Sequence, residues 1–146
     1  MTVAAVIRQK GRNVVSVSPE AGIAEIAAII ASRRIGAVVV LADHGGLAGI
    51  VSERDVVKAL AKHGAKAMEL TASDLMTRQV TTVDMHTSVD HAMEIMDAGY
   101  FRHLPVMDDG QLAGIISIRD LVKHRITQHH RDVEALKAFV AERHRE

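Results

Sequence analysis

Apolar residues recur twice along the chain with the spacing of a helix that buries one side. The first set is Ile23, Ile26, Ala27 and Ile30, and the second is Val89, Ala92, Met93 and Met96. Both sets follow the i, i+3, i+4, i+7 pattern of an amphipathic helix. A β-branched run precedes each helix, at 14–17 and 80–83, and another apolar run follows it, at 37–41 and 103–107. The pattern predicts the order strand, helix, strand, twice over.

The segments that follow these strands repeat almost residue for residue. Residues 47–58 read LAGIVSERDVVK, and residues 112–123 read LAGIISIRDLVK. Turn residues come before them, at 45–46 in the first copy and 108–110 in the second. Because such turns join paired strands, each copy gains a hairpin strand and then a second helix. The repeated unit is therefore β-α-β-β-α.

Each unit has only about 50 residues, too few to bury its helices and sheet alone, so the two units are expected to pack around a pseudo-twofold axis. This predicts an α/β fold, called α+β in some schemes, in which two units form one module. The predicted boundaries are repeat one at 8–62, a linker at 63–77, repeat two at 78–128 and a C-terminal helix at 129–146.

Two features lie outside the repeats. The linker segment 71–74, Thr-Ala-Ser-Asp, has a capping-box pattern that predicts a short helix through Met76. In the C-terminal helix Val133, Leu136 and Val140 fall on one side. We expect that side to pack on the body of the protein or on a second subunit.

Composition narrows the range of partners. The 146 residues carry 18 Lys and Arg against 18 Asp and Glu, a net charge of +0, and 2% are aromatic. A neutral chain lacks the broad attraction of nucleic-acid-binding and membrane-surface proteins. The longest apolar run, 35–42, is too short to span a membrane, and residues 1–10 do not form a signal peptide. With 0 Cys, disulfides and thiolate metal sites are excluded, and a cytoplasmic location is expected.

The pattern Ser-x-x-Asp opens the second helix of each repeat, at 52–55 and at 117–120. One interpretation is structural, because Ser caps a helix and an acidic residue three positions later bonds back to the cap. The other is ligand binding. A carboxylate can accept from both hydroxyls of a ribose, and Arg54 or Arg119 can form paired hydrogen bonds with a phosphate near the helix N-terminus. The two interpretations are compatible, and the pattern alone leaves both open.

The doubled unit, the repeated Gly-x-x-Ser-x-x-Asp, Leu104-Pro105-Val106 and the linker segment Asp74-Leu75-Met76-Thr77 together resemble tandem CBS domains. These are regulatory modules named after cystathionine β-synthase, and the resemblance covers about residues 5–127. It implies two clefts that bind an adenine nucleotide, with AMP as the leading candidate and ADP, ATP, NAD(H) or S-adenosylmethionine as the others. It also implies a homodimer. Modules of this family are often fused to an enzyme, channel or transporter, but only short segments lie outside the repeats here, so a stand-alone module that regulates another protein in trans is expected.

The resemblance assigns residues to each cleft. In one cleft it places Asp120 on the ribose, Ser117 and Arg119 near phosphate, Arg102 and His103 at the mouth, and Asn13, Val15 and Gly36 beside the base. In the other it places Asp55, Ser52 and Arg54 in the matching roles, with Gln79, Thr81 and Phe101 from repeat two. Because Gly36 and Ala37 stand where repeat two has Arg102 and His103, the Asp120 cleft is expected to hold phosphate more firmly.

Other functions are less favoured by the sequence. Catalysis is not expected, because the repeated Ser, Arg and Asp have no adjacent base in the sequence. His124, His129 and His130 are expected to be solvated, and no metal site is predicted. His103 is a candidate ligand contact or pH sensor, with simple packing as the alternative. A ligand-free structural or protein-interaction module is the competing hypothesis, and nucleic-acid binding through the basic stretch 123–131 ranks below it.

Overall fold

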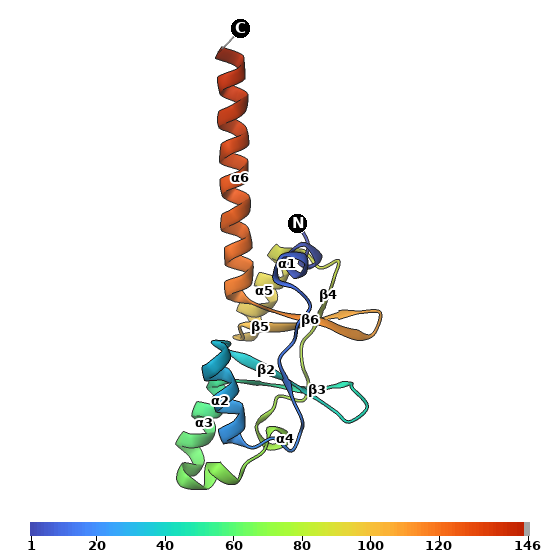
Figure 1. The fold of residues 1–146 in the computed structure, drawn as a ribbon, viewed down its shortest axis with the longest axis vertical. Helices are drawn as coiled ribbons and strands as arrows, with labels where there is room; N and C mark the ends of the chain where they lie inside the picture. The colour runs from blue at the N-terminus through green and yellow to red at the C-terminus, as the bar shows by residue number, and fades with distance from the viewer. Residues whose placement is uncertain (145–146) are drawn as a thin grey trace.

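Two three-stranded sheets with the same strand order lie near the middle of the molecule, one in each of two stacked halves (Figure 1). The computed structural model describes residues 1–144. Each half has the predicted order of strand, helix, strand, strand, helix, so the α+β fold of two related units is confirmed.

The first half contains β1 (Ser16–Val17), α2 (Ile23–Arg33), β2 (Ala37–Leu41), β3 (Leu47–Ser52) and α3 (Glu53–His63). Strand β2 is central, parallel to β1 and antiparallel to β3. The predicted helical stripe faces the sheet, because Ile23, Ile26 and Ile30 are buried in one cluster with residues of β2 and β3. Strand β1 is shorter than the predicted run 14–17, since only its last two residues pair in register with β2.

The second half repeats this arrangement with β4 (Val83–Asp84), α5 (Val89–Gly99), β5 (His103–Asp108), β6 (Gln111–Ser117) and the start of α6 (Ile118–His144). The register is the same in both halves: Val17 pairs with Val40, and Val83 pairs with Val106. Each hairpin has a register shift directly after that second valine. The internal repeat of the sequence is therefore an internal repeat of backbone structure.

An N-terminal helix, α1 (Val3–Lys10), completes the second half rather than the first. Val3, Val6 and Ile7 are buried in the core of the second half. The Val3 N–H donates to the Thr87 carbonyl at 2.7 Å, which fixes the start of α1 beside the start of α5. The sequence pattern did not predict this helix, because eight residues without a side-chain cap give little local signal.

The linker in turn completes the first half. It forms the 3₁₀ helix η1 (Gly64–Glu69) and the short helix α4 (Ala72–Leu75), and Ala67 and Ala72 are buried in the core of the first half. The predicted capping box is present, with the Thr71 N–H donating to Asp74 Oδ2 at 2.9 Å. Thus α1, which precedes the first half in the sequence, packs on the second half, and the linker, which precedes the second half, packs on the first. Neither repeat alone contains all the residues of its hydrophobic core.

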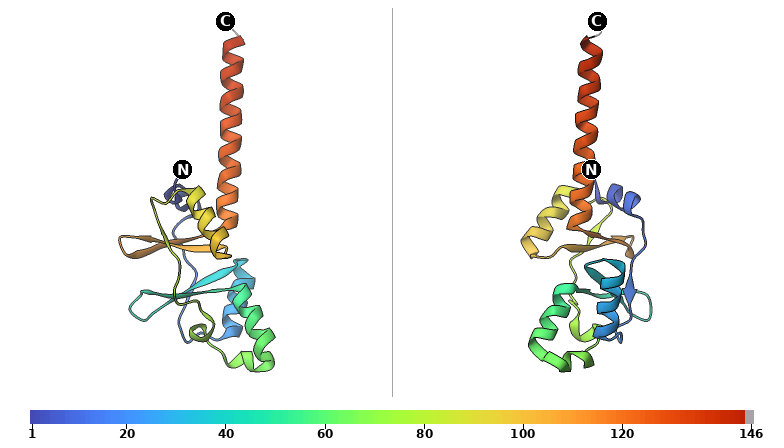
Figure 2. Two further views of the ribbon diagram at one scale, coloured as in Figure 1. Left: turned by 180° about the vertical axis from the view of Figure 1, so that it is seen from behind. Right: turned by 60° about the vertical axis from the view of Figure 1, so that its left-hand side comes forward.

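Helix α6 is continuous from Ile118 to His144, so the expectation of a separate helix starting at 129 is wrong. No Gly or Pro occurs between 118 and 144 to end the helix of repeat two. The C-terminal part of α6 projects away from the two halves (Figure 1, Figure 2), so its apolar residues do not pack on the body. Residues 145–146 of the predicted helix lie outside the described residues.

Candidate functional site

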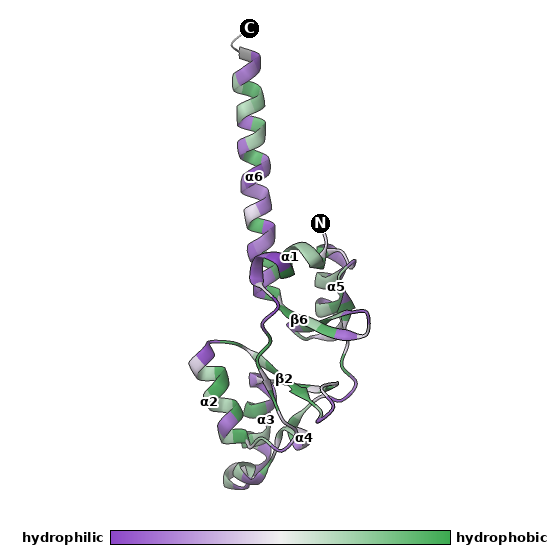
Figure 3. Ribbon diagram, turned by 45° about the vertical axis from the view of Figure 1, so that its right-hand side comes forward, coloured by the Kyte–Doolittle hydropathy of each residue, from purple (hydrophilic) through white to green (hydrophobic). Residues whose placement is uncertain are grey.

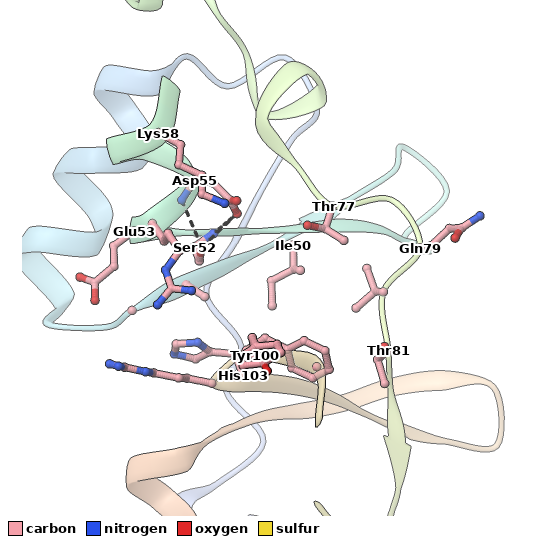
Figure 4. Close-up of a pocket in the computed structure, with 17 residues that line it drawn as sticks. Ile50, Ser52, Glu53, Asp55, Lys58, Thr77, Gln79, Thr81, Tyr100 and His103 are labelled. Atoms are coloured by element: carbon pink, nitrogen blue, oxygen red, sulfur yellow. Dashed lines mark hydrogen bonds between the residues drawn. The ribbon is translucent and has the colours of Figure 1, made fainter. Parts of the chain in front are cut away.

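A cavity of about 390 Å³ lies between the two halves, a size that suits a small organic ligand (Figure 4). The first half contributes the start of β2, the end of β3 and the first turns of α3. The second half contributes the segment before β4 and the α5–β5 junction. The side chains and backbone that line the cavity belong to Gly36, Ala37, Ile50, Ser52, Glu53, Arg54, Asp55, Lys58, Thr77, Gln79, Val80, Thr81, Gly99, Tyr100, Phe101, Arg102 and His103.

Asp55 combines a capping role with an open carboxylate oxygen. Its Oδ2 accepts from the Ser52 N–H at 2.8 Å and from the Ser52 hydroxyl at 3.0 Å, and its own N–H donates to Ser52 Oγ at 3.3 Å. This is the predicted capping box at the start of α3. Within the described residues no hydrogen bond reaches Oδ1 of Asp55, so one oxygen of a cavity-lining carboxylate is still free to accept from a ligand.

Three cationic side chains share the cavity with Asp55 and Glu53. Arg54 and Lys58 come from successive turns of α3, and Arg102 comes from the second half, directly before β5. A cavity with three cations and two carboxylates attracts an anion while keeping a separate acceptor for hydroxyl groups. A phosphorylated sugar carries both kinds of group.

His103 crosses from the second half into this cavity and packs on Gly36. A Cβ at position 36 would lie 2.8 Å from His103 Cε1, so a larger residue there would require the imidazole ring to shift. Burial lowers the pKa of His103 below its ordinary value, and the Lys10 charge lowers it further, while Asp120 and Glu53 partly oppose the shift. The folded protein therefore favours the neutral imidazole.

The equivalent carboxylate in the second half is already occupied by a cation. Asp120 Oδ2 accepts from the Ser117 N–H at 2.8 Å and from Lys10 Nζ at 2.6 Å. Lys10 also donates to the Ile115 carbonyl at 2.7 Å. Lys10 ends α1, the helix that packs on the second half, so α1 places an ammonium group on the carboxylate that the resemblance assigned to a ribose.

The pKa of Asp120 reflects this pairing. Burial raises the pKa of Asp120, but hydrogen bonds from Lys10 and Ser117 and the Lys10 charge outweigh burial, so the net pKa lies below its ordinary value. No such cation is bonded to Asp55 within the described part of the chain. The two repeats therefore have the same capping motif and different electrostatics.

The structure brings together most of the residues assigned to the Asp55 cleft. Ser52, Arg54, Asp55, Gln79, Thr81 and Phe101 all line the cavity. Figure 4 shows Thr77, Gln79 and Thr81 along the segment that leads to β4, with Asp55 at the start of α3 on the other side of the cavity. Whether these side chains bind a nucleotide stays a prediction.

Gly36, Arg102 and His103 were assigned to the Asp120 cleft, and the structure places all three along the cavity that contains Asp55. The starts of β2 and β5 face one another between the halves, so residues there meet the other repeat. His103 also pairs with Ser117 across β5 and β6, and the charge of Asp120 acts on its imidazole, so His103 is close to both carboxylates. Stronger phosphate binding in the Asp120 cleft stays a prediction.

The remaining predicted residues do not line this cavity. Ser117 caps α6 through a bond from the Asp120 N–H at 3.1 Å, and Arg119 is exposed one residue before Asp120. Asn13 is exposed and Val15 is partly buried against the first core.

Several lining residues were missed by the sequence analysis. Lys58 lies one turn after Arg54, a spacing that places both on one face of α3 and could have revealed it. Tyr100 follows α5 in a left-handed conformation with a φ of 57° and lies at the cavity with His103 (Figure 4). Glu53 had no motif signal. Neither had Lys10, which lies outside this cavity and reaches Asp120 because α1 packs on the second half.

His124 corrects another expectation. Its side chain is only 6% exposed, and its Nδ1 lies 3.1 Å from Gln9 Oε1. His124 is buried because this face of α6 packs against the N-terminal segment. Among residues 1–144, no three His, Asp or Glu side chains gather as metal ligands would. No helix in the described part of the chain is both long and apolar enough to cross a membrane.

The family model of the CBS domain matches residues 6–62 and 72–126, and each match contains one structural repeat. The chain belongs to the CBS domain family. Its curated relatives include the CBS domain-containing protein CBSX3, mitochondrial, from Arabidopsis thaliana, which is 31% identical over 112 residues. That match covers 74% of this chain and 54% of the Arabidopsis protein, so the chain spans about half the length of that relative.

Solved structures share this CBS fold. The CBS-domain containing protein ATU1752 from Agrobacterium tumefaciens is 45% identical, with a TM-score of 0.83 over 85% of this chain and 92% of that one. The CBS domain pair of MJ0100, in complex with 5-methylthioadenosine and S-adenosyl-L-methionine, is 26% identical with a TM-score of 0.77 over 88% and 98%. PAE2072 from Pyrobaculum aerophilum, complexed with AMP, is 29% identical with a TM-score of 0.72 over 82% and 89%.

Proposed function

We propose that this CBS pair is a regulatory sensor that binds an adenine nucleotide in the cavity containing Asp55. The observation that carries the proposal is the juxtaposition of an open carboxylate oxygen with three cations in a cavity of about 390 Å³. In this arrangement Oδ1 of Asp55 accepts from the ribose hydroxyls. Arg54, Lys58 and Arg102 hold the phosphate, and Tyr100 and Phe101 supply apolar surface for the base.

The ligands of relatives support this class of molecule. PAE2072 was solved with AMP, and the MJ0100 pair with S-adenosyl-L-methionine and 5-methylthioadenosine. All three molecules contain adenine and ribose, and they differ in charge beyond the ribose. The cationic surplus of the cavity favours a phosphate over a sulfonium group, so we propose AMP first, with ADP, ATP and NAD(H) as the alternatives.

We propose that only the Asp55 cleft binds nucleotide in the state described by the structure. Lys10 neutralises Asp120 and occupies the position from which a ribose would bond to it. Binding in the second cleft requires Lys10 to leave both the carboxylate and the Ile115 carbonyl. The two clefts thus differ because of one side chain from α1.

The proposed output is regulatory and involves no catalysis. Because the cavity is formed by both halves, a bound nucleotide stabilises one relative position of the halves over others. We propose that two copies of the chain pair and that the complex acts on a separate protein in trans. The lack of cysteine suits a reducing compartment such as the cytoplasm.

A thermal-shift panel of AMP, ADP, ATP, NAD(H) and S-adenosylmethionine tests the proposal on protein freed of bound nucleotide. A ligand at about 100 times its Kd adds about 2.7 kcal/mol to the free energy of unfolding, which raises Tm by about 5–10 °C for a chain of this size. If none of the five ligands changes Tm, the sensor proposal is wrong and the interaction-module hypothesis replaces it.

A further inference from the structure

The projecting part of α6 has an apolar stripe that nothing in the described chain covers. Val122, Ile126, Leu136 and Val140 are 41%, 53%, 63% and 44% exposed, respectively. The hydropathy colouring of Figure 3 shows apolar positions alternating with polar ones along this helix. The helix is 27 residues long, or about 40 Å, and contacts the body only at its beginning. Such a helix is stable when its apolar face is buried by a partner.

The stripe follows a heptad repeat. The first heptad position, a, is filled by Ile126, Val133 and Val140, and the fourth position, d, is filled by Val122, His129 and Leu136. A spacing of seven residues keeps these side chains on one seam when two helices coil around each other. β-branched residues at a with leucine at d favour a two-stranded parallel coiled coil; here all three a positions are β-branched, and Leu136 is the leucine among the three d positions. The pattern therefore favours a second copy of the same helix as the partner.

Charged residues beside the seam favour the same orientation. Asp132 is at position g, and Lys137, five residues later, is at position e. In a parallel pair of helices the g residue of one helix faces the following e residue of the other, so Asp132 meets Lys137 of the second copy twice by symmetry. Position e holds Lys123, His130 and Lys137, so an antiparallel pair would bring basic residues together.

We propose that the C-terminal part of α6, from Val122 to Val140, forms a parallel coiled coil with the same segment of a second copy of this chain. The inference rests on the proposed pairing of two copies and is independent of nucleotide binding. A parallel pair places both CBS bodies at the same end of the coiled coil. His129 then faces His129 of the second copy. It forms the one polar layer among the six a and d layers from 122 to 140. A single polar layer of this kind fixes the register of a coiled coil and lowers its stability.

The first test compares two full-length variants by sedimentation velocity over a range of concentrations. Leu136→Glu puts a carboxylate into the seam, whereas Ala138→Glu adds the same charge on the outer face of the same helix turn. We expect the dimer Kd of Leu136→Glu to rise at least about tenfold and that of Ala138→Glu to stay near the wild-type value. Circular dichroism and Tm establish that both variants keep a folded body.

A gain-of-association variant excludes misfolding as the explanation. His129→Leu replaces the polar layer with the residue preferred at d, so the dimer Kd should fall at least about threefold. Weaker or unchanged association of His129→Leu would contradict the proposed seam.

Orientation is tested by cross-linking, which is free of background because the chain has 0 Cys. In a parallel dimer in register, the two thiols introduced by Leu136→Cys face each other and form an intermolecular disulfide on mild oxidation. The two thiols of the control Ala138→Cys lie on opposite outer faces and should stay reduced. Equal cross-linking of both variants would refute the parallel seam.

Two sedimentation results separate the possible failures. If wild type is a dimer and Leu136→Glu associates equally well, the coiled coil is wrong while pairing through the bodies stands. If wild type stays monomeric at all concentrations, both the coiled coil and the proposed homodimer are wrong.

Discussion

Replacing Asp55 by Asn separates the two roles of this carboxylate. The structure gives Oδ2 to the capping box, where it accepts from the Ser52 N–H at 2.8 Å and the Ser52 hydroxyl at 3.0 Å. The amide oxygen of the substituted side chain can take over both bonds, so only the charge at the helix N-terminus is lost. We expect the free energy of unfolding to fall by about 1 kcal/mol or less.

Nucleotide binding should suffer far more. The amide NH₂ then occupies the position of Oδ1, so two ribose hydroxyls lose a charged acceptor and meet a donor instead. Loss of a charge-assisted pair of hydrogen bonds costs about 1.5–3 kcal/mol of binding free energy. Isothermal titration with AMP should show a Kd about ten- to a hundredfold higher than wild type.

Asp74 provides a matched control. Its Oδ2 accepts from the Thr71 N–H at 2.9 Å and from the Thr71 hydroxyl at 3.1 Å, which repeats the geometry at Asp55. Asp74 is exposed and does not line the cavity. Asp74→Asn should therefore lose a similar amount of stability and bind AMP normally. Wild-type AMP affinity in Asp55→Asn would show that the carboxylate is a helix cap and nothing more.

Two further predictions concern Lys10 and His103. Lys10→Ala frees Asp120, so calorimetry should detect a second AMP bound per chain. Arg8→Ala, on the same helix, should leave the stoichiometry at one AMP per chain. An unchanged stoichiometry in Lys10→Ala would show that Lys10 does not block the cleft. Because the pKa of His103 is lowered in the folded state, the unfolded chain binds more protons as pH falls below about 6.5, and stability declines in that range. Urea titrations from pH 7 to 5 should show a shallower decline for His103→Gln, and equal slopes would contradict this assignment.

The repeat unit and the capping boxes could be predicted from the sequence because they depend on local patterns. The buried stripe from Ile23 to Ile30 follows from the helical spacing of apolar residues. The turns before the repeated strands follow from residue types that favour turn conformations. The capping pairs Ser52 with Asp55 and Thr71 with Asp74 are bonds over three residues. Local geometry of this kind is the same in any surrounding fold.

The coiled-coil pattern of α6 was also present in the sequence, but its meaning depended on where the helix goes. Val133, Leu136 and Val140 were seen to share one side. Only the structure excludes the body as their partner, because α6 continues straight past the second half without a break. The sequence shows that no Gly or Pro interrupts the helix between 118 and 144, but it does not show the direction in which α6 leaves the body.

Tertiary structure alone decided how the two halves share residues. The sequence analysis assigned Arg102 and His103 to the cleft of Asp120, and packing between the halves brings both to the cavity that contains Asp55 as well. Lys10 reaches Asp120 across 110 positions of the chain. Two related repeats provide nearly the same local environment twice, so a local pattern cannot tell which repeat a side chain will face. That choice is made when α1 and α4 pack on opposite halves and bury their apolar residues there.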